Sequence, residues 1–236
     1  MESEQTQSGD LYTLLGKLEQ HKNQIITGVV VVIAVGIIVS FISYRKSEKE
    51  IEAGQALSAI LLTGNSNGPA TDSLLKIAND SAGTDAAARA LLAVAGKQFV
   101  DGKTDDAKAS FQRFVTDYPD NVLISQAKYG IAVCLETQGK TAEAATAFKE
   151  VVDRYAGENT TTPAKFALAR IYETEGKLEQ ARDYYLDIAR DGRSTFGMEA
   201  GSRLTALFQK HPNLRPTAPP AMNRTAVAPA AAPVAP

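Results

Sequence analysis

Residues 96–104 contain the residue types of a phosphate-binding loop. They read Gly-Lys-Gln-Phe-Val-Asp-Gly-Lys-Thr, and a loop ending in Gly-Lys-Thr can hold phosphates through backbone N–H groups and the lysine ammonium. The stretch has one residue more between its glycines than a P-loop has, and no buried-strand pattern precedes it. The same Gly-Lys pair recurs at Gly139 and Gly176. We therefore interpret all three pairs as turns and expect no nucleotide binding.

The remaining reactive residue types do not form a site either. The acidic residues beside the first turn lack the alternating ligands and late glutamate of a calcium loop; they are Asp101, Asp105 and Asp106. Cys134 is the single cysteine, so a disulfide or a cysteine zinc site within the chain is excluded, and we interpret it as a buried thiol. His21 and His211 share no ligand-like spacing. The sequence therefore predicts no enzyme, no cofactor and no metal.

The composition fits a helical protein with no affinity for nucleic acid. The chain has 236 residues, a formal net charge of -2 and 22% charged residues of mixed sign, so it lacks the basic surface that nucleic acid requires. It is rich in alanine and poor in β-branched residues outside one segment, which favours packed helices over sheets. No feature of the sequence points to a small-molecule substrate.

Residues 23–44 form an uncharged run that predicts a transmembrane helix. The twenty residues from Ile25 to Tyr44 span about 30 Å as a helix, which is the thickness of a hydrocarbon core. Lys22, Arg45 and Lys46 flank the run as polar anchors. A cleavable signal peptide has a shorter apolar region followed by small residues, so we expect an anchor that stays in the mature chain.

The residues around this run leave two questions open. In residues 1–22, leucines spaced as one helix face predict a short amphipathic helix at the membrane surface or a plain extension of the anchor; they are Leu11, Leu14, Leu15 and Leu18. Lys17 and Lys22 precede the run, whereas Arg45, Lys46 and Lys49 follow it. This narrow excess of positive charge favours a cytoplasmic location for the large C-terminal part.

The region after residue 84 is a threefold repeat. Gly102, Gly139 and Gly176 are 37 residues apart, and a lysine follows each. Further columns share this register: Ala90, Ala127 and Ala164; Ala107, Ala144 and Ala181; Phe111, Phe148 and Tyr185; Phe114, Val151 and Ile188. Each unit reads as a helix, a glycine turn in the left-handed conformation and a second helix. We expect Thr104 and Thr141 to be N-caps of second helices.

These columns divide the chain into segments. The repeat units are residues 84–120, 121–157 and 158–193, and a capping helix at 194–209 extends the repeat domain to 211. Residues 45–83 form a linker with a degenerate helical pair at 50–62 and 71–79, separated by a turn at 65–69. Residues 212–236 are rich in proline and alanine, and we expect a disordered tail because they contain too little apolar bulk to fold.

The repeat columns resemble the tetratricopeptide repeat (TPR) family. Val94-Ala95, Ile131-Ala132 and Leu168-Ala169 match its Leu-Gly position, and Tyr172 matches its tyrosine. The first unit departs from the pattern, since Gln98 stands there with Phe99 one residue late. The family period is about 34 residues, so the longer period here implies longer connections between units, such as residues 120–124. The resemblance implies a TPR-type α-solenoid, so that together with the apolar run and the proline-rich tail we expect an all-α chain of one transmembrane helix, the solenoid and a disordered tail.

The whole arrangement is similar to a bacterial group that contains the ancillary subunit of the Sec translocon and the TPR domain of the cell-division coordinator. Members carry the repeats in the periplasm, where they act as chaperone-like contacts for exported proteins. The resemblance therefore implies a single-pass inner-membrane protein with periplasmic repeats, and translocon subunits or exported clients as partners. The Lys/Arg count gives the alternative, in which the repeats are cytoplasmic.

In TPR folds the first helix of each unit lines a concave face, and this geometry implies the candidate binding residues. They are Arg89, Leu92 and Phe99 in the first unit, Tyr129, Val133 and Glu136 in the second, and Phe166, Arg170 and Glu173 in the third. Mixed aromatic and charged residues suit capture of a peptide or a helix. The alternatives to an export role are an adaptor for envelope assembly or cell division, and a non-catalytic subunit of a membrane enzyme complex.

Overall fold

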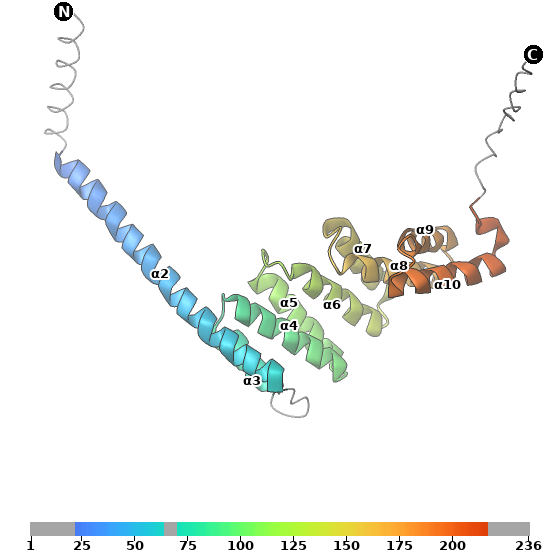
Figure 1. The fold of residues 1–236 in the computed structure, drawn as a ribbon, viewed down its shortest axis with the longest axis horizontal. Coiled ribbons are helices and arrows are strands. Elements are labelled where there is room, and N and C mark those ends of the chain that lie inside the picture. The colour runs from blue at the N-terminus through green and yellow to red at the C-terminus, as the bar shows by residue number, and fades with distance from the viewer. Residues whose placement is uncertain (1–21, 64–69, 217–236) are drawn as a thin grey trace, which may run out of the picture. The chain divides into compact units, whose positions relative to one another are not determined.

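All regular elements in residues 22–63 and 70–216, which the computed structural model describes, are helices (Figure 1). The all-α prediction is confirmed for these residues. The expected amphipathic helix within residues 1–22, the turn at 65–69 and most of the tail lie outside the described residues. The chain divides into two compact units, Met1–Ile124 and Ser125–Pro236.

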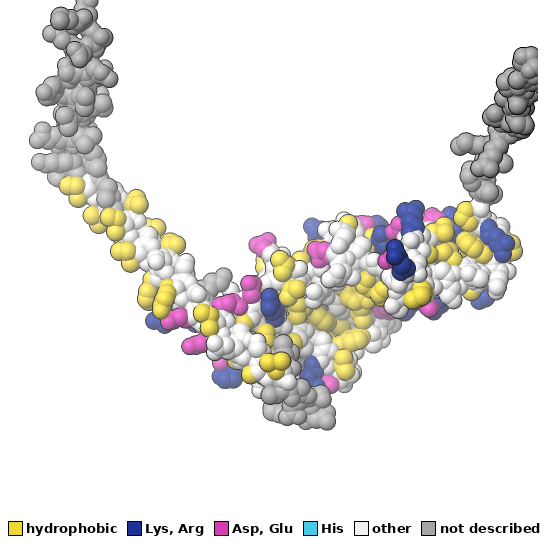
Figure 2. Space-filling view, in the orientation of Figure 1, with side chains coloured by type: hydrophobic (Ala, Val, Ile, Leu, Met, Phe, Trp, Pro, Cys, Tyr) yellow, Lys and Arg dark blue, Asp and Glu magenta, His cyan; other side chains and the backbone are white. Residues whose placement is uncertain are grey.

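The first unit begins with one long helix, α2 (Lys22–Thr63), which continues without a break from the apolar run into the region predicted as a linker. In its apolar segment, defined here as residues 26–44, every large hydrophobic side chain that the structure describes is at least 53% exposed. Figure 2 shows this segment in yellow and white, with charged side chains only farther along the helix. Among the described helices, α2 alone has the length and composition to cross a membrane, a test that a signal sequence also passes.

The rest of α2 packs against the first helical pair, α3 (Ala70–Asp80) and α4 (Asp85–Val100). Ala53 and Leu57 are buried there, with exposures of 4% and 5%. The Glu50 carboxylate accepts hydrogen bonds from the backbone N–H groups of Asp85 at 2.7 Å and Ala86 at 2.9 Å. Because the first N–H groups of a helix have no partner within it, Glu50 caps α4 from another helix.

The first unit is completed by α5 (Thr104–Asp117), which packs antiparallel to α4. Phe114 of α5 is fully buried. Two contacts tie the chain after α5 to the start of α4: the Gly83 N–H donates to the Tyr118 hydroxyl at 3.3 Å, and the Asn121 amide donates to the Asp85 carboxylate at 3.3 Å.

The second unit contains α6 (Ile124–Thr137, from Ser125 on), α7 (Thr141–Arg154), α8 (Thr161–Thr174), α9 (Leu178–Ala189) and α10 (Thr195–Lys210). Phe148, Val151 and Leu168 are fully buried in a cluster that α6, α7 and α8 form. Tyr185 and Ile188 belong to a second cluster, which α8, α9 and α10 form. These buried residues include the aromatic and aliphatic columns of the 37-residue repeat.

The turn between the two helices of a unit has the same backbone geometry in all three repeats. Gly102, Gly139 and Gly176 have φ values of 77°, 73° and 73°, which confirms the left-handed turn. The lysine that follows each glycine has φ near -83° and ψ near 62°, and it precedes the second helix as its N-cap without a side-chain hydrogen bond. The prediction of Thr104 and Thr141 as N-caps is therefore wrong: both are the first helical residues.

The start of the predicted disordered tail is ordered. Pro212–Leu214 forms a short 3-10 helix after α10, and the Leu214 N–H donates to the His211 carbonyl at 3.0 Å. Leu214 is buried, with an exposure of 3%. The prediction that disorder begins at residue 212 is wrong for these residues, because one leucine among the prolines finds an apolar site against α10 and α9.

Candidate protein-binding surface

In the first unit, the three candidate residues lie on α4 and keep contact with solvent. Arg89 is exposed, and Leu92 and Phe99 are half-buried. The opposite side of α4 is buried in the helical pair, since Leu91, Val94 and Ala95 are at most 1% exposed. Arg89 also lines a small hollow of about 170 Å³ beside Asp85 and the loop that follows α5.

In the second unit, the α6 candidates combine an aromatic ring with a carboxylate. The ring of Tyr129 lies 5.7 Å from the ring of buried Phe148, and Val133 packs on the same cluster. Burial raises the pKa of the Tyr129 hydroxyl, and the nearby Glu136 carboxylate raises it further. Tyr129 is therefore a neutral hydrogen-bond donor on a rigid support.

The α8 candidates repeat this arrangement 37 residues later. The ring of Phe166 lies 5.7 Å from that of Tyr185 and 5.6 Å from that of Phe196 on α10. Tyr129 and Phe166 occupy the same repeat column, as do Phe148 and Tyr185, so each first helix supports its half-buried ring on a buried ring of the second helix. The surface of the second unit thus carries two partly exposed rings fixed from beneath.

Charged residues run beside these rings. The Arg170 guanidinium donates to the Glu136 carboxylate, which joins α8 to α6. Glu173 accepts a hydrogen bond from the Tyr185 hydroxyl at 3.0 Å and has Arg203 of α10 at 4.0 Å. Burial and this hydrogen bond raise the pKa of Tyr185. A polar hollow of about 430 Å³ is lined by Arg170, Glu173, Thr174 and Arg203.

Comparison with known families identifies the repeat. A family model described as a tetratricopeptide repeat-like domain matches residues 18–146, more than half of the chain, and a tetratricopeptide repeat model matches residues 162–188. The chain belongs to the tetratricopeptide repeat-like family. The repeat resemblance seen in the sequence is thereby confirmed, and a TPR fold makes this protein an interaction scaffold for other proteins.

Solved structures show the same TPR fold at low identity. The chain is similar to the nearly identical TPR-like repeats of a putative kinesin light chain of Podosopora anserina and to a variant of those repeats with one substitution. Both matches have 14% sequence identity and a TM-score of 0.51, and both cover 72% of this chain. They cover 90% of the unsubstituted repeat protein and 89% of the variant. No curated protein matches the chain significantly. TPR proteins are typically non-catalytic, in line with the expectation of no enzyme activity.

Two residues of α10 join the TPR surface although the sequence did not point to them. Phe196 packs against Phe166 and is 37% exposed, and Arg203 approaches Glu173. The segment 194–209 falls outside the 37-residue columns, so no register could assign either residue to the surface. The signal that could have indicated them is the presence of an aromatic residue and an arginine in the helix that follows the last repeat.

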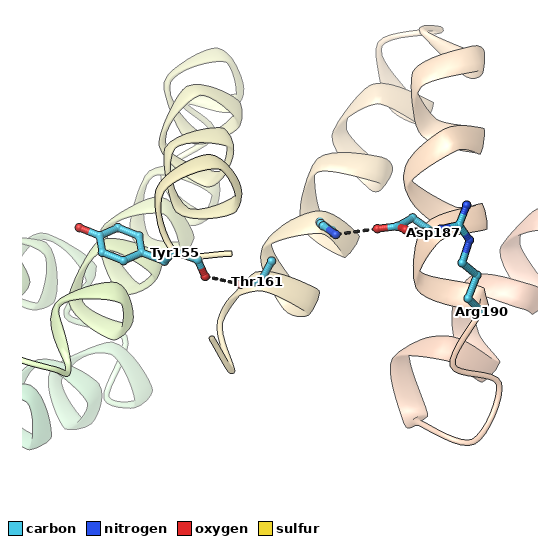
Figure 3. A network of polar contacts seen from close by, with 5 residues as sticks. Tyr155, Thr161, Asp187 and Arg190 are labelled. Atoms are coloured by element: carbon cyan, nitrogen blue, oxygen red, sulfur yellow. Dashed lines mark hydrogen bonds and ion pairs between the residues drawn. The ribbon is translucent and has the colours of Figure 1, made fainter. Parts of the chain in front are cut away.

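A second set of polar contacts in the second unit lies along its helices and between neighbouring helices. The Asp187 carboxylate accepts hydrogen bonds from the Lys165 ammonium at 2.6 Å and from the Arg190 guanidinium at 3.3 Å (Figure 3). The Thr161 hydroxyl donates to the Tyr155 carbonyl at 2.6 Å. One repeat earlier, the Glu150 carboxylate accepts from Lys128 at 2.7 Å and Arg154 at 3.0 Å. The lysine–carboxylate pairs lie within repeats, whereas the Thr161–Tyr155 bond joins two successive repeats, and both kinds of contact stabilise the TPR fold.

The residues with the chemistry of a phosphate or metal site have structural positions instead. Gly96 lies inside helix α4, so residues 96–104 do not form a phosphate-binding loop. Asp101 ends that helix and pairs with Lys97 at 3.3 Å. Cys134 is fully buried, which confirms the interpretation of its thiol. Within the described residues no cluster of His, Cys, Asp or Glu is suited to hold a metal ion.

Proposed function

We propose that this protein is a membrane-anchored TPR scaffold that binds proteins or peptides beside the membrane. In this proposal it is ancillary to the Sec translocon or a chaperone-like contact for exported chains. The observation that carries the anchoring is the exposed apolar segment of α2, residues 26–44. Burial of one Val, Ile or Phe side chain stabilises by about 1.5–3 kcal/mol, so an exposed run of such residues strongly favours a lipid environment.

The export role rests on the resemblance of the whole arrangement to the Sec-ancillary group. A short N-terminal segment, one apolar helix and TPR units of the long 37-residue type occur here in the order of that group. In the proposal the protein lies in the bacterial inner membrane and its repeats face the periplasm. The Lys/Arg count around the helix favours the opposite side by one residue, which is a small margin.

The second unit carries the principal binding face in this proposal. Tyr129 and Phe166 present rings on rigid supports, and Arg170 pairs with the Glu136 carboxylate while its side chain stays 45% exposed. Aromatic and arginine side chains at the centre of an interface contribute most to affinity. The corresponding face of the first unit offers Leu92 and Phe99, and in this proposal we assign it a secondary role.

Photo-crosslinking in native membranes tests the proposal. A photoreactive amino acid replaces Phe166 in the full chain, and a matched variant carries it at Thr146, an exposed residue of α7. We expect position 166 to trap translocon subunits or exported chains, because the α8 face contacts them, and position 146 to trap neither.

The products distinguish the candidate functions. When export is blocked, loss of the products at position 166 supports contact with clients in transit. Products limited to a fixed set of division or envelope proteins, unchanged by the block, would assign the chain to the adaptor class instead. Equal products at both positions would remove the α8 face as the binding surface.

A further inference from the structure

The anchor and the first TPR unit form one continuous structure. Helix α2 has no break between its apolar segment and the docked residues Ala53 and Leu57. Tyr44, the last residue of the uncharged run, precedes Glu50 by six residues. At about 1.5 Å per residue, the Glu50 carboxylate therefore lies about 9 Å along the helix from the end of that run.

Glu50 marks one end of the first unit. It caps α4 at Asp85 and Ala86, so the turn of residues 81–84 lies at its level. Hydrogen bonds from Gly83 to Tyr118 and from Asn121 to Asp85 bring the loop of residues 118–123 to the same end. We name residues 81–85 and 118–123 together the Glu50 edge.

The other end of the first unit points away from the apolar segment. Helix α3 returns along α2 toward Glu50, and α4 then reverses, because α3 and α4 pack as a hairpin joined by the turn of residues 81–84 (Figure 1). Val100 ends α4, fifteen residues after Asp85, or about 22 Å farther along. The hydrocarbon core is about 30 Å thick and the bilayer with headgroups about 40–45 Å, so each headgroup layer is about 5–7 Å deep. The Glu50 edge, at about 9 Å, thus lies about 2–4 Å outside that layer and within side-chain reach of the headgroups, and Val100 lies well beyond it.

We propose that the Glu50 edge contacts the zwitterionic phospholipid headgroups of the membrane that holds α2. This inference rests on the proposed anchoring. Val122 in this loop is 84% exposed, and in the proposal its apolar side chain enters the interface. The hollow beside it combines an arginine with two aspartates, which match the phosphate and the ammonium of a zwitterionic headgroup; it is lined by Asp85, Arg89, Asp120, Asn121, Val122 and Leu123.

The contact has a consequence for the partner of the scaffold. A unit that is attached by a continuous helix and also contacts the headgroups has restricted movement relative to the membrane. Its α4 face, with Leu92 and Phe99, stays within a few tens of ångströms of the bilayer, as the length of α4 dictates. The partner of that face is then a segment at the membrane surface, such as a chain leaving a membrane channel.

Fluorescence quenching in nanodiscs tests the contact. The full chain with Cys134→Ala, which removes the buried native thiol, receives a fluorescent label at a single cysteine: Val122→Cys, Val100→Cys or Val35→Cys. Val100 is the matched control, because it is 83% exposed and lies at the opposite end of the first unit. The nanodiscs contain phosphatidylcholine with a nitroxide on either the headgroup or the acyl chain.

We expect the headgroup nitroxide to reduce fluorescence at position 122 and to leave position 100 unchanged, while the acyl-chain nitroxide quenches position 35. Equal quenching at 122 and 100, with position 35 still quenched, would overturn the headgroup contact and leave the anchoring intact. An unquenched position 35 would instead contradict the proposed anchoring. In nanodiscs rich in phosphatidylglycerol we expect weaker quenching at 122, because Asp85 and Asp120 repel anionic lipid; stronger quenching there would refute the zwitterionic assignment.

Discussion

The two units of this TPR protein share the same repeat but make different contacts. In the first unit, a helix from outside the repeats, α2, caps α4 through Glu50 and buries Ala53 and Leu57. In the second unit, ion pairs within repeats such as Lys128–Glu150 fasten the helices, and partly exposed rings and arginines remain on the first-helix face. The comparison teaches that the shared columns specify only the stack, whereas the residues between them specify what each unit contacts.

Removal of a core ring is the strongest test of the division into units. Phe148 is fully buried and Phe111 is its counterpart in the first unit. We expect Phe148→Ala to lower the free energy of unfolding by about 3–5 kcal/mol, because it leaves a cavity. Urea denaturation measures the loss, and hydrogen exchange should rise mainly in α6, α7 and α8. Phe111→Ala should raise exchange in α4 and α5; a uniform rise across both units in either variant would contradict two separable units.

The glycine turn should behave alike in both units. Gly139→Ala places a side chain at φ of 73°, and we expect a loss of about 1–2 kcal/mol of stability. Gly102→Ala should cost a similar amount in the first unit. Gly201 is the control, since it lies inside α10 and an added Cβ would meet open space, and Gly201→Ala should stabilise by about 0.5–1 kcal/mol. Thermal unfolding of the four proteins checks the order, and a neutral Gly139→Ala would show that the turn relaxes.

The Glu50 cap should matter in the first unit alone. Glu50→Ala removes the acceptor for two N–H groups at the start of α4, so we expect about 1 kcal/mol of destabilisation. Hydrogen exchange at Asp85 and Ala86 should accelerate, while the amides of α8 keep their protection. Glu52, an exposed residue of the same helix, supplies the control Glu52→Ala. Unchanged hydrogen exchange at Asp85 and Ala86 would contradict a role of Glu50 as the cap of α4.

The ion pair at Glu150 should give the smallest effect, confined to the second unit. The hydrogen bond from Lys128, and to a lesser extent that from Arg154, holds the pKa of the Glu150 carboxyl below its usual value. A depressed pKa means that the pair stabilises the fold above the unfolded-state pKa, near 4.3, and that this contribution is lost as the pH falls through the folded-state pKa. Since Glu150 is partly exposed, we expect Glu150→Gln to cost less than about 1 kcal/mol at pH 7. Urea denaturation at pH 7 and below pH 4 should show the difference disappearing in acid; a difference that grows in acid would reverse this assignment.

The sequence predicted the glycine turns and the buried columns, because each of these features requires a particular kind of residue at a fixed position. Gly102, Gly139 and Gly176 were recognised because a left-handed turn favours glycine, and the buried columns because burial requires small or apolar side chains. The N-caps were misplaced by one residue because the backbone of the lysine, rather than the threonine hydroxyl, begins the helix.

Contacts between distant segments could not be predicted in this way. Glu50 and Asp85 form a hydrogen bond although 35 residues separate them in the sequence. Neither residue belongs to a column of the 37-residue repeat, so the repeat pattern gave no signal for this contact. Arg203 and Phe196 join the α8 face only because α10 packs there. The nine candidate residues were assigned by analogy with the family, and their role in binding stays a prediction.

One measurement addresses the central claim, that the first-helix face of the second TPR unit binds the partner. In native membranes the full chain carries a photoreactive residue in place of Tyr129, and the yield of the crosslinked partner is compared for Arg170→Ala and Arg89→Ala, two exposed arginines on first helices of different units. We predict that Arg170→Ala lowers the yield about tenfold, corresponding to about 1.4 kcal/mol of binding energy, and that Arg89→Ala changes it less than about twofold. Equal losses, or a greater loss for Arg89→Ala, would contradict the claim.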